Sequence, residues 1–276
     1  MAPIKPVLVV FGISHFCEKA RWGLDWHGIS YTEIGWPPGL HRALLRQHGA
    51  KGSSLPVVLD GDLVVEGSGA IIDWAESKAQ GRTRSLNPQT GDLAETREIE
   101  RRADEVVGFH VRRLAYAETL PHYSHLVRPM LFLRCTAWHR LIGGVMWPVT
   151  RRIMMRMYDI RPGAASESRA ALESELDWLD AKLSDGRFYL VGENFSRADL
   201  TVASLLAGFA RPKEMSVYHG MTRPDALAVD IERWRSRPVM QWVIDQYRTH
   251  RNARATEGCR QQPPDNAEGS YQQNRY

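Results

Sequence analysis

Short apolar runs and helical stripes alternate over the N-terminal part of the chain. A run of β-branched and apolar residues at 7–12 ends in glycine and predicts a buried strand. Residues 15–27 carry apolar side chains at helical spacing and predict a helix. A second, half-exposed strand is expected within 30–36, and a short helix near 40–47. This order of strands and helices indicates an α/β unit.

A hairpin signal follows. Two runs rich in valine and leucine flank Asp60 and Gly61, a pair suited to the left-handed dihedral angles of a tight turn. Residues 55–66 are therefore predicted to form a β-hairpin. The segment 68–79 then has helical spacing, with Ser68 expected as the residue that caps its N-terminus.

A polar stretch at 80–92, rich in Gly, Pro, Asn, Ser and Thr, indicates a domain boundary. Beyond it the strand signals stop and helical patterns take over. We predict an α/β domain over 1–82, a linker over 83–91 and an all-helical domain over 92–250. The remaining residues, 251–276, are polar and poor in aliphatic side chains, and they are predicted to form a disordered tail.

One helical segment, 141–157, is the most membrane-like part of the chain. It contains Pro148 and three arginines, and it is too short to cross the ~30 Å hydrocarbon core of a bilayer. It could lie on a membrane as a basic amphipathic helix. We favour instead burial of its apolar face inside the helical domain, with the arginines toward water. No stable membrane insertion is expected.

Composition narrows the class of protein. A chain of 276 residues, 43% of them hydrophobic, can fill the cores of two ordinary domains. The formal net charge is +4 and the basic residues are interleaved with acidic ones, so nucleic-acid binding is not expected. Cys17, Cys135 and Cys259 are widely and irregularly spaced, which argues against a disulfide framework and favours a reducing, cytoplasmic compartment. His122 and His125 have no third ligand pattern nearby, so no metal is expected. The N-terminus has no signal-peptide pattern.

Ser14 and Cys17 lie one turn apart at the start of the first predicted helix and face the same way. Free N–H groups and partial positive charge at this helix end stabilise a thiolate. The sulfur could be that of Cys17 itself or that of a small thiol held beside Ser14. Simpler roles are also open: Ser14 as a helix cap, and Cys17 as a small buried apolar residue.

Four motifs, in order, resemble those of the cytosolic glutathione transferases. They are "SHFCEKAR", "SLPVV", "SGAIIDWAE" and "FYLVGENFSRADLTVASLLA", and the likeness extends over residues 7–249. The last motif also has a physical meaning of its own. Ser196 and Asp199 form the Ser-x-x-Asp pattern of a capping box that starts a helix.

The resemblance implies a thioredoxin-like N-terminal domain followed by an all-helical C-terminal domain. It implies that Ser14 donates a hydrogen bond to the sulfur of glutathione, the co-substrate, and favours its thiolate. The backbone of Leu55, before a cis Pro56, would pair with the cysteinyl amide of glutathione. Ser68 would bind the γ-glutamyl carboxylate and Glu66 the amino group. An apolar electrophile would bind against the helical domain, and the protein would be a homodimer.

The sequence departs from the family in one place. The acidic residue that usually stands directly before the serine is replaced by Gly67, and Glu66 lies one position earlier. In a regular strand a shift of one residue turns a side chain to the opposite face. Gly67 could also allow a local bulge that restores the direction of Glu66. Two further alternatives for the function stay open. One is a non-catalytic binding protein of the same fold, and the other is a glutathione-dependent thiol oxidoreductase that uses Cys17.

Overall fold

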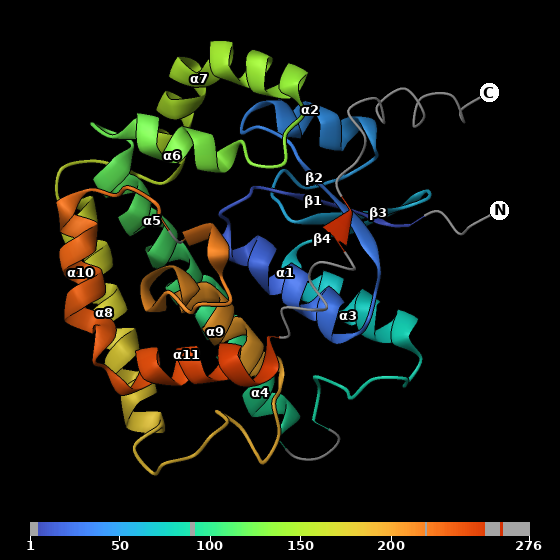
Figure 1. Cartoon of the computed structure of the whole chain (residues 1–276), viewed down its shortest axis with the longest axis vertical. Coiled ribbons are helices and arrows are strands. Elements are labelled where there is room, and N and C mark those ends of the chain that lie inside the picture. Colours follow the sequence, from blue (N-terminus) through green and yellow to red (C-terminus); the bar gives the residue numbers. More distant parts are fainter. Residues whose placement is uncertain (1–4, 89–91, 219, 252–259, 262–276) are drawn as a thin grey trace.

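The α/β domain is built as the sequence predicts. The computed structural model of the chain describes residues 5–88, 92–218, 220–251 and 260–261 (Figure 1). The first domain contains β1 (Val7–Val10), α1 (His15–Trp26), β2 (Tyr31–Gly35), α2 (Leu40–Gln47), β3 (Val57–Asp60), β4 (Leu63–Glu66) and α3 (Ser68–Ala79). A two-residue strand, β5 (Arg260–Gln261), completes the sheet, whose order is β4-β3-β1-β2-β5.

The sheet is mixed, and β1 lies at its centre. β1 pairs in parallel with β2 and antiparallel with β3, and all four of its residues are buried. The hairpin is confirmed, with Asp60 opposite Leu63 across a two-residue turn. The turn comes one residue later than expected because Gly61 is its first residue, with a φ of 61° that glycine adopts without steric cost.

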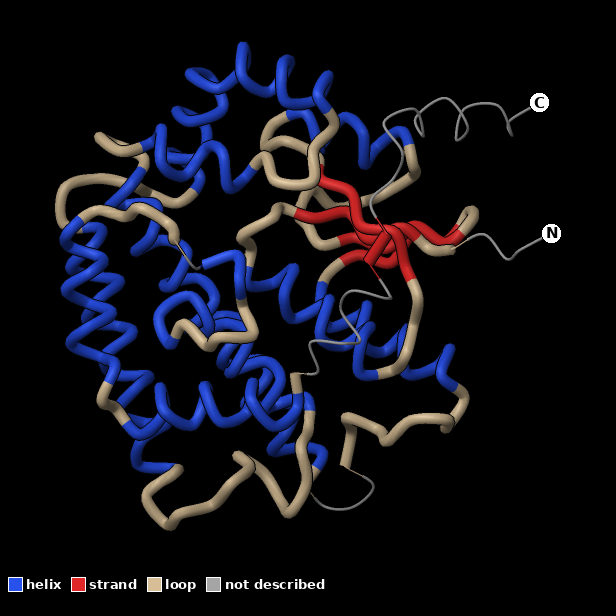
Figure 2. Tube along the Cα trace, in the orientation of Figure 1, coloured by secondary structure: helices blue, strands red, loops and turns tan. Residues whose placement is uncertain are grey.

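Every regular element described between residues 92 and 251 is helical, which confirms the all-helical second domain (Figure 2). Its elements are α4 (Leu93–Arg102), a π-helical turn η1 (Ala103–Val107), α5 (Gly108–Thr119), α6 (Ser124–Leu131), α7 (Ala137–Met157), α8 (Ala164–Lys182), α9 (Arg197–Ala210), a 3-10 turn η2 (Ser216–Tyr218), α10 (Asp225–Arg235) and α11 (Pro238–His250).

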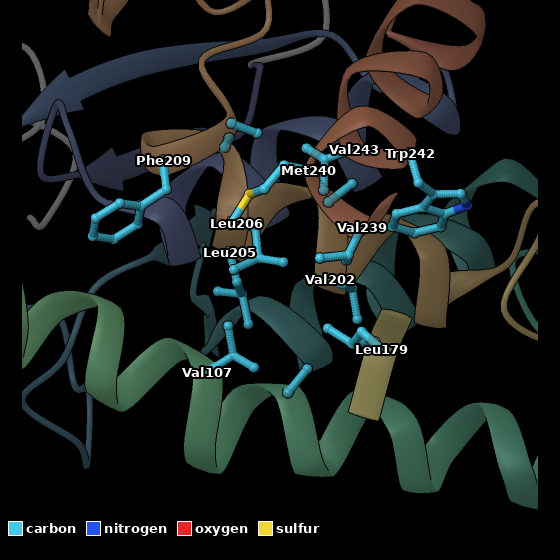
Figure 3. Close-up of a cluster of buried hydrophobic side chains, with 14 of the residues drawn as sticks. Val107, Leu179, Val202, Leu205, Leu206, Phe209, Val239, Met240, Trp242 and Val243 are labelled. Carbon is cyan, nitrogen blue, oxygen red and sulfur yellow. The ribbon is translucent and has the colours of Figure 1, made fainter. Parts of the chain in front are cut away.

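Helix α9 runs through the middle of this domain. The predicted capping box at its start is confirmed: the Asp199 carboxylate accepts the N–H of Ser196 at 2.8 Å and that of Leu190 at 2.7 Å. Figure 3 shows α9 side chains such as Leu206 meeting Val239 and Met240 at the start of α11. The same apolar cluster includes Trp22, so α1 packs against the helical domain as well as against its own sheet.

The apolar surface of α7 is exposed, and the prediction that it is buried is wrong. Trp138, Leu141, Val145 and Val149 are 62%, 58%, 76% and 58% exposed. The helix lies at the edge of the molecule and turns only a narrow stripe toward the body (Figure 1). Apolar residues cover more of its circumference than that stripe can bury. Among the described residues, no helix is long and apolar enough to cross a membrane.

Part of the predicted tail belongs to the folded protein. Arg251 is buried and forms ion pairs with Glu18 and Asp25 of α1. Arg260 and Gln261 pair in parallel with β2. The other residues of the predicted 251–276 tail, and residues 89–91 of the predicted linker, lie outside the described part of the chain.

Candidate functional site

A cavity of about 380 Å³ opens between the two domains. On one side lie the loop from β1 to α1, with Ser14, and the loop before β3, with Leu55. On the other side lie helices α5, α6 and α7, whose contribution is mostly apolar. Their side chains in the lining are Val111, Arg112, Ala115, Tyr116, Thr119, Leu126, Val127, Leu131, Met146, Val149, Thr150, Ile153, Met154 and Met157.

Ser14 lies in the cavity wall and caps α1. Its Oγ accepts a hydrogen bond from the N–H of Cys17 at 3.4 Å, while its own N–H donates to the Phe11 carbonyl. The cap uses the hydroxyl as an acceptor. Because a serine hydroxyl can also donate one hydrogen bond, its O–H can turn toward a ligand in the cavity. The capping role and the proposed binding role are therefore compatible.

Cys17 lies on the protein side of the same turn. Its side chain is fully buried in the core of the α/β domain, and it does not line the cavity. Burial raises the pKa of its thiol above the ordinary value, although Arg21 and the Ser14 hydroxyl favour the thiolate. A thiol in this position is mostly protonated at neutral pH and has no contact with solvent.

Thiol reagents should therefore fail to label Cys17 in the folded protein. Cys135 is also buried, and burial raises its pKa to about 12. In a Cys259→Ser variant we expect no fast-reacting thiol at neutral pH and two after denaturation, measured with a chromogenic disulfide reagent. Fast labelling of Cys17 in the folded chain would contradict this expectation.

The bond between Leu55 and Pro56 is cis, as the resemblance predicts. Leu55 lines the cavity, whereas Pro56 does not. In the described part of the chain, no hydrogen bond occupies the N–H or the carbonyl of Leu55. This backbone pair can therefore receive an extended, peptide-like ligand in the manner of an added strand.

Glu66 and Ser68 do not reach the cavity lining. The Glu66 carboxylate accepts the backbone N–H groups of Lys51 at 2.7 Å and Gly52 at 2.6 Å. Ser68 is buried as the first residue of α3, and Gly67 is the cap, so the expectation that Ser68 caps the helix is wrong by one residue. Gly67 directly follows β4 and has a φ of 91°, a conformation in which any other residue would be strained.

The structure adds polar cavity residues that the sequence reasoning missed. His41 accepts the N–H of Gly39 at its Nδ1 atom, so its Nε2–H donates to the Ser53 carbonyl at 3.0 Å. Arg112 of α5 lies over the rings of Phe16 and Tyr158, and its Nε has no partner among the described residues. No local motif distinguishes either residue, because both lie in ordinary helical sequence.

Buried histidines make the fold sensitive to acid. Desolvation, reinforced by Arg112, lowers the pKa of His15 to about 3, and desolvation lowers that of His41 to about 4. The unfolded chain binds protons at these positions below about pH 6.5, whereas the folded chain stays neutral there until about pH 3 to 4.

Stability should therefore fall as the pH falls from 6.5 toward 4, by up to roughly 1.4 kcal/mol per pH unit for each histidine. Urea unfolding measured across this range checks the expectation. A His15→Asn variant should show a shallower dependence on pH than the parent chain. An equally steep dependence in both would exclude His15 as a contributor.

No group of three or more potential metal ligands occurs among the described residues. Two family models match the sequence. One is the glutathione S-transferase N-terminal domain, over residues 8–83, and the other is the glutathione S-transferase C-terminal domain, over residues 147–224. No curated protein matches the sequence.

Solved structures share the fold. Glutathione transferase GSTFuA3 from Phanerochaete chrysosporium is 19% identical with a TM-score of 0.63, over 90% of this chain and 98% of that one. The beta-etherase LigF from Sphingobium sp. strain SYK-6 is 17% identical with a TM-score of 0.56, over 88% and 100%. Glutathione transferase URE2P8 from Phanerochaete chrysosporium, solved with oxidized glutathione, is 16% identical with a TM-score of 0.50, over 90% and 98%.

Proposed function

The chain belongs to the glutathione transferase family, and on that premise we propose that it activates glutathione for attack on an apolar electrophile. The observation that carries this proposal is the position of Ser14. Its hydroxyl lies in the wall of the cavity between the domains, at the N-terminus of α1, with an O–H that can donate.

The proposed chemistry is stabilisation of a thiolate. Glutathione bound in the cavity loses its thiol proton to solvent, and the Ser14 O–H donates a hydrogen bond to the resulting sulfur anion. The free N–H groups at the start of α1 add partial positive charge on the same side. Arg112 contributes a full positive charge to the cavity wall. The thiolate then forms a bond to the electrophile, whose leaving group departs with the electron pair.

The peptide part of glutathione would pair with Leu55. Its N–H and carbonyl can exchange two hydrogen bonds with the cysteinyl amide of the ligand. Ser68 at the N-terminus of α3 and Glu66 are the predicted partners of the γ-glutamyl end. Glu66 already binds two backbone N–H groups, so this end of the ligand has the weakest support.

The electrophile would lie against α5 and α7. Apolar side chains there, such as Val111, Met154 and Ile153, give little basis for polar recognition, so the substrate class is apolar. Cytoplasmic location and a homodimer stay part of the proposal. The buried free thiols of Cys17 and Cys135 support a reducing compartment.

Two alternatives make different demands on the site. An oxidoreductase needs a reactive thiolate, and the burial and raised pKa of Cys17 weigh against it. A non-catalytic binding protein of the same fold is favoured by one observation, the engagement of Glu66 away from the cavity.

Calorimetric titration of glutathione into the full chain tests the proposal, followed by a turnover assay with an aryl halide. We expect saturable binding and turnover. Binding without turnover would favour the non-catalytic alternative, and the absence of both would exclude glutathione as the ligand. Formation of a mixed disulfide at Cys17 with oxidised glutathione would favour the oxidoreductase.

A further inference from the structure

Helix α7 presents a continuous apolar stripe to solvent. Its exposed large apolar side chains include Trp138, Leu141, Val145, Val149, Ile153 and Met157, spaced three or four residues apart over a helix of 21 residues. Half of the exposed large apolar side chains in the described chain belong to this one helix. Such a patch on a protein surface is typical of an interaction site.

The surroundings of the stripe are strongly basic. From residue 119 to residue 158 the chain has six arginines and neither aspartate nor glutamate. Arg140, Arg152 and Arg156 of α7 are exposed, and in the described part of the chain none of them forms an ion pair with a carboxylate. Exposed arginines elsewhere in the helical domain, such as Arg101 and Arg161, are paired with nearby acids.

We propose that α7 docks in the plane of an anionic lipid membrane surface. An apolar stripe flanked by unpaired arginines is complementary to both parts of such a surface, acyl chains and lipid phosphates. Arginine stems can lie along the apolar stripe while their guanidinium groups reach the phosphates. Trp138 is suited to the boundary between headgroups and acyl chains.

A second copy of the chain fits this surface less well. In a twofold dimer the same patch lies on both partners. The basic patch with Arg140, Arg152 and Arg156 would then face its own copy, with no acidic residue between residues 119 and 158 to neutralise the arginines. Like charges across an interface oppose association.

The position of α7 allows docking without a change of fold. The helix lies at the periphery of the molecule (Figure 1). Val149, Ile153 and Met157, in the C-terminal part of the stripe, also line the cavity between the domains. A docked helix would bring the cavity opening close to the acyl region, where apolar molecules accumulate. Docking itself does not depend on the proposed enzymatic activity.

Vesicle flotation of the full chain tests this inference. We expect the protein to float with vesicles of phosphatidylcholine and phosphatidylglycerol, and less with phosphatidylcholine alone or at high salt. A Leu141→Glu/Val145→Glu variant should lose at least about tenfold in binding. An Arg152→Ala/Arg156→Ala variant should lose roughly thirtyfold, from about 1 kcal/mol for each arginine.

Val229→Glu is the matched control. Val229 lies on α10 and is 64% exposed. The substitution therefore adds a charge at an exposed apolar position outside α7 and should leave flotation unchanged. Thermal unfolding verifies that each variant folds. Lack of flotation with anionic vesicles would overturn the inference, as would equal flotation of the α7 variants. Self-association without lipid that Leu141→Glu/Val145→Glu abolishes would assign the surface to a second copy instead.

Discussion

Replacement of Ser14 by alanine should lower the turnover of glutathione with an aryl halide by about one to three orders of magnitude, the range for losing one donor to a stabilised anion. The Ser14 hydroxyl lies in the cavity wall and already accepts the N–H of Cys17. The substitution would therefore remove the O–H that donates a hydrogen bond to the sulfur anion. Steady-state kinetics at neutral pH measure the effect. The pKa of bound glutathione, followed by thiolate absorbance, should rise in the same variant.

Two further variants at Ser14 separate donation from helix capping, because Ser14→Ala also removes a cap that contributes about 1 kcal/mol to stability. Ser14→Thr keeps both functions and should retain most of the activity. Ser14→Asp keeps the cap but has no O–H when ionised, so it should be folded and inactive. Cys17→Ala should leave turnover nearly unchanged. If Cys17→Ala abolishes activity while Ser14→Ala does not, Ser14 is not the activating group.

Much of the fold could be predicted because its signals are local. The hairpin depends on two valine-rich runs and a glycine turn, and the capping box on two residues three positions apart. The hairpin turn and the cap of α3 each lie one residue away from the position predicted from the sequence. In both places a glycine, Gly61 or Gly67, adopts a positive φ, which residues with a side chain rarely adopt.

The candidate site could be predicted only in part. Ser14 and the loop before β3 follow from motifs, but Arg112 and His41 reach the cavity through packing between segments far apart in the sequence. Helix α7 shows a second limit. Periodicity indicates that a helix has an apolar stripe, but whether another element covers that stripe depends on the rest of the fold. Here the stripe stays exposed.

Replacement of Arg251 by alanine should lower the free energy of unfolding by about 3–5 kcal/mol, the range for breaking a buried ion pair by removing one partner. Arg251 Nε lies 2.9 Å from the Glu18 carboxylate, and Nη1 lies 2.7 Å from that of Asp25. The three side chains are only 2–3% exposed. Removal of the guanidinium leaves two buried carboxylates, Glu18 with Arg21 at 3.6 Å and Asp25 with the Tyr31 hydroxyl at 3.2 Å as remaining partners. Urea denaturation at neutral pH measures the loss.

Arg248→Ala, in the last turn of α11, is the matched control. Its guanidinium is 71% exposed and pairs with Asp245 one turn away, so its loss should change stability by no more than about 0.5 kcal/mol. A chain that ends at Arg251 keeps the buried pairs and, of the contacts within the described part of the chain, loses the short pairing of β5 with β2. We expect it to unfold cooperatively, with nearly the parent stability and glutathione affinity. Equal stability of the Arg251→Ala and parent chains would show that Glu18 and Asp25 find other partners, and that Arg251 does not fasten the end of α11 to α1.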